Sequence, residues 1–227
     1  AINTFASEKR IDVALGQNPE EIGIELLNFV DAMRPPSFKK IFAQRKTIKR
    51  ILAFPPKKNN KRLHNLILKN GLEGLPILKC WPEDGGNFIT LPLVQTLDPI
   101  SKAPNLGMYR MHVYDNFSTG MHMQIGKGGG YHYKEAEKLG KALPVAVTLG
   151  GDPVLTIASI MALPEGIGEL EFAGLVRGKR TKLSKSKTIN MHAPSSGEFL
   201  MEGYLKPNER KLEGPFGDHF GHYSEAD

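Results

Sequence analysis

The chain has 227 residues and a formal net charge of +6, and 40% of its residues are hydrophobic, so it can bury the core of one large domain or of two small ones. Its one cysteine, Cys80, excludes an internal disulfide bond, and no apolar run approaches the roughly 18 residues of a membrane-spanning helix. With no signal-peptide pattern either, we expect a reducing, cytoplasmic setting, with membrane association at most peripheral.

The first 62 residues are predicted to hold two helices. Asn18 is a good N-cap and Pro19 suits a first helical turn, and the apolar stripe that follows ends at Pro35–Pro36. A second helix, basic and amphipathic, is predicted from about residue 39 to Pro55–Pro56. Residues 57–62 resemble a linker, so we predict a domain boundary there.

Residues 32–72 carry twelve lysines and arginines and no acidic residue. Three partners fit this charge: water, an anionic membrane surface and nucleic acid. No nucleic-acid-binding module or stacking aromatics accompany the basic residues, so we predict no nucleic-acid partner. A solvated helix face is the favoured interpretation, and peripheral membrane contact is the second.

Residues 63–227 are predicted to be mainly β, which is typical of a β-barrel or a sandwich. Residues 115–120 are a predicted hairpin loop, and two short helices interrupt the strands, one at 133–142 and one that starts at Asp152–Pro153. The predicted strands are 63–68, 88–97, 108–114, 121–125, 145–149, 171–176, 181–191 and 198–205.

Two carboxylates, Glu213 and Asp218, lie five residues apart across a Gly-Pro turn. Proline fixes φ and glycine permits a reversal, so both acids can face one cavity. A carboxylate pair in unlike environments can keep one acid ionised while the other delivers a proton near neutral pH. General acid/base chemistry and a solvated surface turn both fit this heptapeptide taken alone.

Six blocks, in order, make the chain resemble the UbiD-type decarboxylases, which use prenylated flavin mononucleotide (prenylated FMN). The resemblance implies a partial N-terminal α/β domain at 1–62 and a split β-barrel of the flavin-reductase kind at 63–227, within a longer chain. The blocks are Leu75–Pro82 (LPILKCWP), Phe88–Leu93 (FITLPL), Asn105–Arg110 (NLGMYR), Pro144–Pro153 (PVAVTLGGDP), Pro164–Glu169 (PEGIGE) and Glu213–His219 (EGPFGDH).

The same resemblance implies a set of site residues. Arg110 would orient the substrate carboxylate and pair with Glu213, and Glu213 or Asp218 would deliver the proton that replaces carbon dioxide. Asn105 and Glu169 match two ligands of a divalent metal, manganese or magnesium, that bridges to the flavin phosphate. A potassium ion is a further candidate. The implied cofactor-binding residues are Asn105, Gly107, Met108, Tyr109, Arg110, Gln124, Ser159, Met161 and Glu169.

One position departs from the family pattern, because Gly126 stands where a histidine is usually the third metal ligand. His122, His132 or water could fill that place, or the metal could bind weakly. The glycine-rich residues 126–130 could cradle a phosphate, but they lack the phosphate-loop ending, and a flexible loop fits them equally.

The sequence therefore predicts a reversible, non-oxidative decarboxylase of an aromatic or α,β-unsaturated acid, such as the 4-hydroxy-3-polyprenylbenzoate of ubiquinone biosynthesis. The flavin would do the carbanion chemistry, and the protein would supply orientation and a proton. A homo-oligomer and a flavin prenyltransferase that supplies the cofactor are the implied partners. A non-catalytic flavin-binding or assembly subunit is the alternative function.

Overall fold

The computed structural model describes residues 5–32, 42–61, 66–124, 126, 128–164 and 166–226. The chain divides into two compact units. Unit 1 comprises residues 1–59, 151–183 and 194–196, and unit 2 comprises residues 60–150, 184–193 and 197–227. The chain first changes unit next to the predicted boundary at 62, but residues 151–183, which we predicted within the second domain, belong to unit 1.

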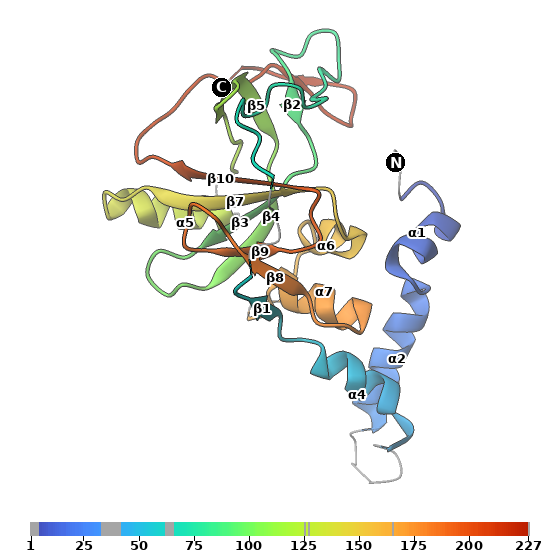
Figure 1. Ribbon diagram of the computed structural model, residues 1–227. Helices are drawn as coiled ribbons and strands as arrows, with labels where there is room; N and C mark the ends of the chain where they lie inside the picture. The colour runs from blue at the N-terminus through green and yellow to red at the C-terminus, as the bar shows by residue number, and fades with distance from the viewer. Residues whose placement is uncertain are drawn as a thin grey trace. The chain divides into compact units, whose positions relative to one another are not determined.

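Helices dominate unit 1 (Figure 1). The predicted N-cap Asn18 accepts a hydrogen bond from Glu20 N at 2.8 Å, and Asp152 accepts one from Val154 N at 3.0 Å. The predicted helix starts at these two positions are therefore confirmed, whereas the first helix, capped by Ser7, was not predicted. The helices are α1 (Glu8–Leu15), α2 (Pro19–Ala32), α4 (Arg45–Leu52), α6 (Pro153–Ala158) and α7 (Glu169–Arg177), and the strand is β1 (Lys57–Asn59).

Arg50 of the basic helix α4 points into unit 1 and not into solvent. Its Nε donates to Glu25 Oε2 at 2.9 Å and its Nη1 donates to the backbone oxygen of Val176 at 2.6 Å. The guanidinium thereby links α2, α4 and the last turn of α7. Arg45, Lys46 and Lys49 remain exposed, as predicted for a solvated face, and the predicted residues 39–41 lie outside the described ranges.

The predicted strand at 171–176 is wrong, because these residues belong to α7. Gly168 is the N-cap and Gly178, at φ 64°, ends the helix in the left-handed conformation that glycine favours. Leu170, Ala173 and Gly174 are buried, and their spacing places them on one face of a helix. Packing of that face decides the structure of this segment, and the alternation of apolar and polar residues alone suggests a strand instead.

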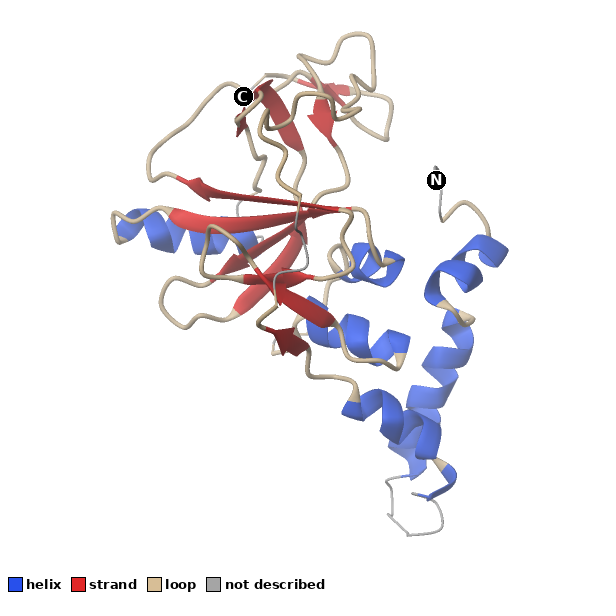
Figure 2. Cartoon of the chain, in the orientation of Figure 1, coloured by secondary structure: helices blue, strands red, loops and turns tan. Residues whose placement is uncertain are grey.

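The main sheet of unit 2 is antiparallel, with strand order β10-β7-β3-β4. Its strands are β3 (Leu93–Leu97), β4 (Pro104–Met108), β7 (Leu143–Leu149) and β10 (Phe199–Leu205), and helix α5 (Gly128–Lys138) contacts β3, β4 and β7. The predicted strands 145–149 and 198–205 are confirmed within two residues. Figure 2 shows these four strands as one layer, coloured red, with α5 beside it.

Smaller sheets complete unit 2. One has the order β2-β5-β6 and another is the pair β11-β12. The strands are β2 (Phe88–Ile89), β5 (Met111–Asp115), β6 (Ser118–Thr119), β11 (Phe216–Gly217) and β12 (Tyr223–Ser224). The predicted hairpin at 115–120 is confirmed by the pairing of Asp115 with Ser118.

Three predicted strands are interrupted, and others are not strands. Thr90–Pro92 separates β2 from β3, Tyr109 and Arg110 separate β4 from β5, and the segment predicted at 181–191 forms only β8 (Lys182–Lys185) before β9 (His192–Pro194). Proline lacks the amide that a central strand needs, which explains the first break. Residues 66–68 and 121–124 are not in strands, and the predicted linker contributes β1.

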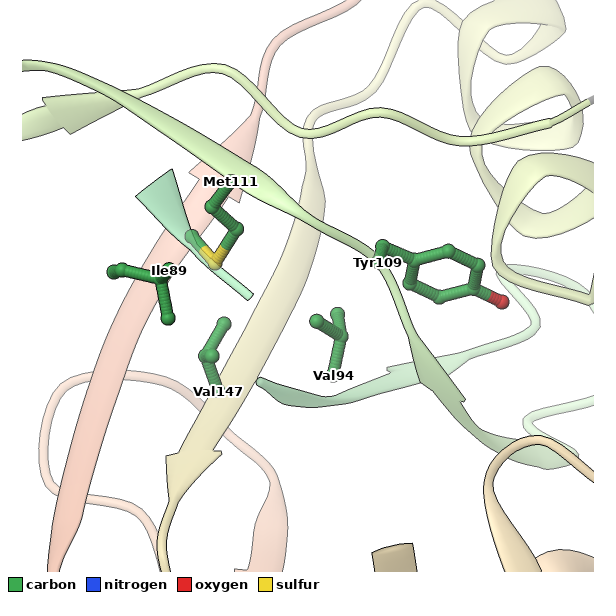
Figure 3. Close-up of a cluster of buried hydrophobic side chains, with 5 residues drawn as sticks. All are labelled: Ile89, Val94, Tyr109, Met111 and Val147. Carbon is green, nitrogen blue, oxygen red and sulfur yellow. The ribbon is translucent and has the colours of Figure 1, made fainter. Parts of the chain in front are cut away.

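The core beside β5 is built from Ile89, Val94, Tyr109, Met111 and Val147 (Figure 3). All five are less than 9% exposed, and Val113 packs against them. Met111 and Val113 share one side of β5, because successive side chains of a strand alternate between its two sides. The opposite side of β5 therefore contacts other parts of unit 2.

Glu202 of β10 holds the loop at residues 187–189, and this predicts a pH-dependent stability. It accepts hydrogen bonds from Lys187 N at 2.7 Å and from Thr188 Oγ1 at 2.6 Å, and also from the amides of Thr188 and Ile189. Burial alone would raise the pKa of Glu202, but these bonds outweigh it, so that pKa lies below its ordinary value of 4.5.

Replacing Glu202 with glutamine should therefore reduce the free energy of unfolding at pH 7 by on the order of 1 kcal/mol. Because the pKa of Glu202 is lower in the folded protein than in the unfolded chain, its carboxylate stabilises the folded protein fully at pH values above the unfolded-state pKa. That stabilisation is lost as the pH falls through the folded-state pKa. Urea unfolding of both proteins at pH 7 and pH 3 measures this. A difference between them that is as large at pH 3 as at pH 7 would contradict the assigned cause.

Candidate functional site

Arg110 and Glu213 form a closely paired, shielded ion pair in unit 2. Arg110 Nε donates to Glu213 Oε1, and Arg110 Nη2 donates to Oε2, both at 2.8 Å. The Glu213 side chain is 8% exposed and that of Arg110 is 19% exposed. Two parallel charge-assisted bonds fix both the distance and the plane of the two groups. The structure thus brings together two of the residues predicted for catalysis.

Local structure explains how residues 103 positions apart in the sequence meet. Arg110 lies in the two-residue break between β4 and β5. Glu213 lies near the end of the long connection from β10 to β11. Gly214, which follows Glu213, has φ 99°, a conformation that favours glycine, and the Gly214–Pro215 peptide bond is cis. Glu213 is thus followed by a glycine in a conformation that other residues rarely adopt, and its carboxylate meets Arg110.

Two further side chains surround the Arg110 guanidinium, and sequence patterns did not predict either one. The guanidinium carbon lies 4.5 Å from the centre of the Phe216 ring, which is cation–π geometry. Arg110 Nη2 also donates to Ser224 Oγ at 3.3 Å, and this hydroxyl donates to the backbone oxygen of Phe216. Strands β11 and β12 thus fix the face and one edge of the guanidinium.

His122 is a second basic group beside Glu213. Its Nδ1 lies 3.6 Å from Glu213 Oε2, within ion-pair range when the imidazole is protonated, and its side chain is 36% exposed. Its backbone amide donates to the backbone oxygen of Arg110 at 3.1 Å. We considered His122 as a substitute metal ligand, but in this structure its Nδ1 faces the Glu213 carboxylate.

Asp218 is engaged in its own turn. Its Oδ1 accepts hydrogen bonds from Phe220 N at 2.8 Å and from His222 N at 3.4 Å. Among the contacts of the described residues, none joins Asp218 to Glu213 or to Arg110. The prediction that both acids face one cavity therefore stays a prediction, and Glu213 is the acid whose contacts favour a catalytic role.

The N-terminus of α5 forms a close-packed cradle with Asn105 and Tyr109. Gly129 N donates to Tyr109 Oη at 3.0 Å, and Asn105 Nδ2 donates to the same oxygen at 3.3 Å. A Cβ atom added to Gly128 would collide with Asn105 Oδ1, and one added to Gly129 would lie 2.9 Å from the Tyr109 ring. The predicted flexible loop is thus partly a helix start, and the first-turn amides of a helix favour an anion where they are not already bonded, as that of Gly129 is to Tyr109.

The other predicted cofactor residues divide between the two units. Gly107, Met108 and Gln124 belong to unit 2, and a Cβ added to Gly107 would meet the Tyr109 ring. Ser159, Met161 and Glu169 belong to unit 1, with Glu169 at the first residue of α7. The pairing of Asn105 with Glu169 around a metal therefore stays a prediction.

Several observations bear on the metal prediction. Within the described residues, no group of three or more histidine, cysteine, aspartate or glutamate side chains could hold a metal ion. Gly126 has φ 91° and open space where a Cβ would lie. His132 is buried, and its Nδ1 shares a hydrogen bond of 2.8 Å with Thr96 Oγ1. Burial lowers the pKa of His132, partly offset by Asp98, and its hydrogen bond to Thr96 joins α5 to β3.

A protein-family model for the UbiD 3-octaprenyl-4-hydroxybenzoate carboxy-lyase Rift-related domain matches residues 57–227. Among curated proteins, an uncharacterised protein of Archaeoglobus fulgidus is 42% identical over 225 residues, which are 98% of this chain and 47% of that protein. A 4-hydroxybenzoate decarboxylase subunit of Chlamydia pneumoniae is 38% identical over 224 residues, which are 98% of this chain and 38% of that protein.

Solved structures of decarboxylases and UbiD-class enzymes are also similar to this chain. Vanillic acid decarboxylase of Sedimentibacter hydroxybenzoicus, in its closed form, superposes with a TM-score of 0.79 at 27% identity, covering 99% of this chain and 47% of that one. The UbiD-class enzyme HmfF from Pelotomaculum thermopropionicum, in complex with FMN, has a TM-score of 0.78 at 22% identity, covering 97% of this chain and 46% of that one. The chain thus spans about half the length of these relatives or less.

Proposed function

The chain belongs to the UbiD family, and from that premise we propose that the protein is a non-oxidative, reversible decarboxylase of an aromatic or α,β-unsaturated carboxylic acid that uses prenylated FMN. The observation that carries the proposal is the shielded, two-bonded pair of Arg110 and Glu213, at the positions that match the family's catalytic residues. We further propose that residues 63–227 form the split β-barrel expected of such enzymes.

The residues of unit 2 fit an anionic cofactor. The backbone amides in the first turn of α5, other than that of Gly129, which is bonded to Tyr109 Oη, would hold its phosphate together with the Asn105 side chain, because backbone N–H groups at a helix N-terminus favour an anion. When bound, prenylated FMN supplies the electron sink for the carbanion chemistry. Met108 and Gln124 would line the same site from unit 2, and Ser159 and Met161 are proposed contributors from unit 1.

Arg110 and Glu213 would then act directly on the substrate. The carbon–carboxylate bond breaks, carbon dioxide leaves, and a proton must reach the carbon that held the carboxylate. Arg110 would orient the substrate carboxylate, and Glu213, in its protonated form, would release its proton from one oxygen to that carbon and become a carboxylate. His122, partly exposed and 3.6 Å from Glu213 Oε2, is placed to stabilise the carboxylate that remains. Asp218 remains a second candidate proton donor.

A divalent metal remains a proposal with a specific prediction. Asn105 and Glu169 suit a hard ion such as manganese or magnesium, but Gly126 offers no third side-chain ligand, so no chemical step is assigned to a metal. Gly126→His should tighten manganese binding on the order of tenfold in the full-length protein, because the position has space for a side chain.

Calorimetric titration with manganese measures that change, after circular dichroism shows that the variant folds, since φ 91° is unfavourable for histidine. His122→Ala and His132→Ala in the native background test substitute ligands. Equal affinity in the native protein and in all three variants would mean that residue 126 is not the position of the missing ligand.

The alternative function is a non-catalytic flavin-binding or assembly subunit, and the departure at Gly126 favours it.

Peripheral contact of the exposed basic face of α4 with an anionic membrane is a further proposal; within the described residues, no helix has the length and apolarity needed to span a bilayer. A homo-oligomer, a potassium ion and a flavin prenyltransferase that supplies the cofactor remain proposed partners, and a cytoplasmic location remains proposed.

The deciding experiment uses the full-length protein purified from cells that make prenylated FMN. The proposal predicts flavin absorption in the purified protein and release of carbon dioxide from a panel that includes 4-hydroxybenzoate, vanillate and an acrylic acid. Bound flavin without turnover of any acid would favour the non-catalytic subunit. Absence of both would overturn the proposed function.

A further inference from the structure

One side of the strand around β5 contacts three consecutive residues of the segment that carries Glu213. Arg110, His112 and Tyr114 alternate with Met111 and Val113, which pack into the core. Side chains two residues apart share a side of an extended strand, so the three lie in a row opposite the core. This Arg-x-His-x-Tyr pattern was visible in the sequence, but only the structure shows what the row contacts.

The contacts follow the chain residue by residue. Tyr114 Oη donates to the backbone oxygen of Leu212 at 2.9 Å. Arg110 binds both carboxylate oxygens of Glu213, and the amide of Gly214 donates to His112 Nδ1 at 3.4 Å. The backbone is therefore held on each side of Glu213, while Arg110 holds its side chain.

The two rings are themselves held in place. His112 stacks on Phe88 with ring centres 4.5 Å apart, and the centre of the Tyr114 ring lies 5.0 Å from that of His112. A Cβ added to Gly86 would lie 2.5 Å from His112 Nε2, so Gly86 lets the chain pass close to the imidazole. Burial, and then the charge of Glu213, raise the pKa of Tyr114, so its hydroxyl remains a donor at neutral pH.

We propose that His112 and Tyr114 are positioning residues that fix the backbone on both sides of Glu213 and thereby place its carboxylate for proton delivery. The inference rests on the proposed function and adds two residues to it. Misplacing a catalytic group by about 1 Å can slow a reaction about a hundredfold, so two backbone contacts next to the acid are sufficient to matter.

The chain offers a matched control for the tyrosine. Tyr133 of α5 donates to the backbone oxygen of Lys206 at 2.8 Å, on the same connection but well before Glu213. Tyr114→Phe and Tyr133→Phe each remove one hydroxyl and one hydrogen bond to a backbone oxygen. His112→Phe keeps a stacking ring and removes the acceptor of the Gly214 amide.

Hydrogen–deuterium exchange in the full-length protein reports the contacts without any turnover. Tyr114→Phe and His112→Phe should each speed exchange of the peptide that covers residues 211–215 by about tenfold or more, and Tyr133→Phe should leave that peptide unchanged. Unchanged exchange of that peptide in both variants, with normal folding by circular dichroism, would overturn the proposal.

Kinetics complete the test. Tyr114→Phe should lower kcat about tenfold with KM within about twofold, because the change misplaces the acid without removing a substrate contact, and Tyr133→Phe should retain normal kcat. An active native protein with normal kcat in Tyr114→Phe would overturn the positioning role alone. A native protein inactive on every acid tested would overturn the proposed function, and the positioning role with it, whatever the exchange data show.

Discussion

Replacing Glu213 with glutamine is expected to lower the rate of decarboxylation at least about a hundredfold while the protein stays folded. Glutamine keeps the shape of the side chain, and its oxygen can still accept one hydrogen bond from Arg110, but its amide cannot carry the proton to carbon. The effect should fall on kcat, because in the proposed function Arg110, and not Glu213, binds the carboxylate of the substrate.

Glu209→Gln is the matched control for this variant. Glu209 lies on the same connection and pairs with Lys206 at 3.5 Å, but its side chain is 52% exposed. The control should turn over normally. Product formation, measured in single-turnover and steady-state assays, decides the result, and near-normal kcat in Glu213→Gln would leave Asp218 as the proton donor. Loss of folding instead would mean that Glu213 has a structural role.

The second expected result concerns geometry more than charge, since Arg110→Lys keeps the positive charge. Lysine is a point charge and cannot make the two parallel bonds at 2.8 Å that Arg110 makes to Glu213. It also lacks the planar group that stacks over Phe216. We expect kcat/KM to fall about a hundredfold, with a contribution from KM, because lysine can neither hold Glu213 through two bonds nor orient the substrate carboxylate as the planar guanidinium would in the proposed function.

Arg210→Lys controls for the loss of an arginine fork elsewhere. Arg210 stacks over Tyr133 with its guanidinium carbon 4.8 Å from the ring centre and pairs with Glu137, but its side chain is 64% exposed. This control should keep kcat/KM within about twofold, as exposed ion pairs contribute little. Equal losses in Arg110→Lys and Arg210→Lys would show that Arg110 acts through general stability and not at the substrate.

Local signals predicted those parts of the fold that local interactions determine. The side chains of Asn18 and Asp152 cap the helices they were expected to start, and the β-branched run at 145–149 forms β7. The strand predicted at 171–176 failed because a segment this short fits both periods, and the choice depends on which face meets α4 and α6. That information is absent from any local window.

The site divides in the same way. The pairing of Arg110 with Glu213 came from a resemblance of whole motifs, because no local rule joins positions so far apart in the chain. The contacts of His122, Phe216 and Ser224 with the Arg110–Glu213 pair escaped prediction: His122 was a candidate only as a substitute metal ligand, and isolated phenylalanine and serine residues carry no pattern of their own. The contacts of Asp218 were not predicted either, since a polar residue beside a turn can accept hydrogen bonds from backbone amides of that turn, as Asp218 does from Phe220 and His222.

The guanidinium of Arg50 sets a constraint on the order of events during synthesis. Its partner Glu25 is made before it, but the backbone oxygen of Val176 that accepts its other bond comes 126 residues later. At about 5 to 20 residues per second, on the order of ten seconds separates these two moments on the ribosome. During that interval the intervening chain, which includes the strands β3, β4 and β7, emerges first. Helices α2 and α4 are therefore made well before the last of the partners that Arg50 joins to them.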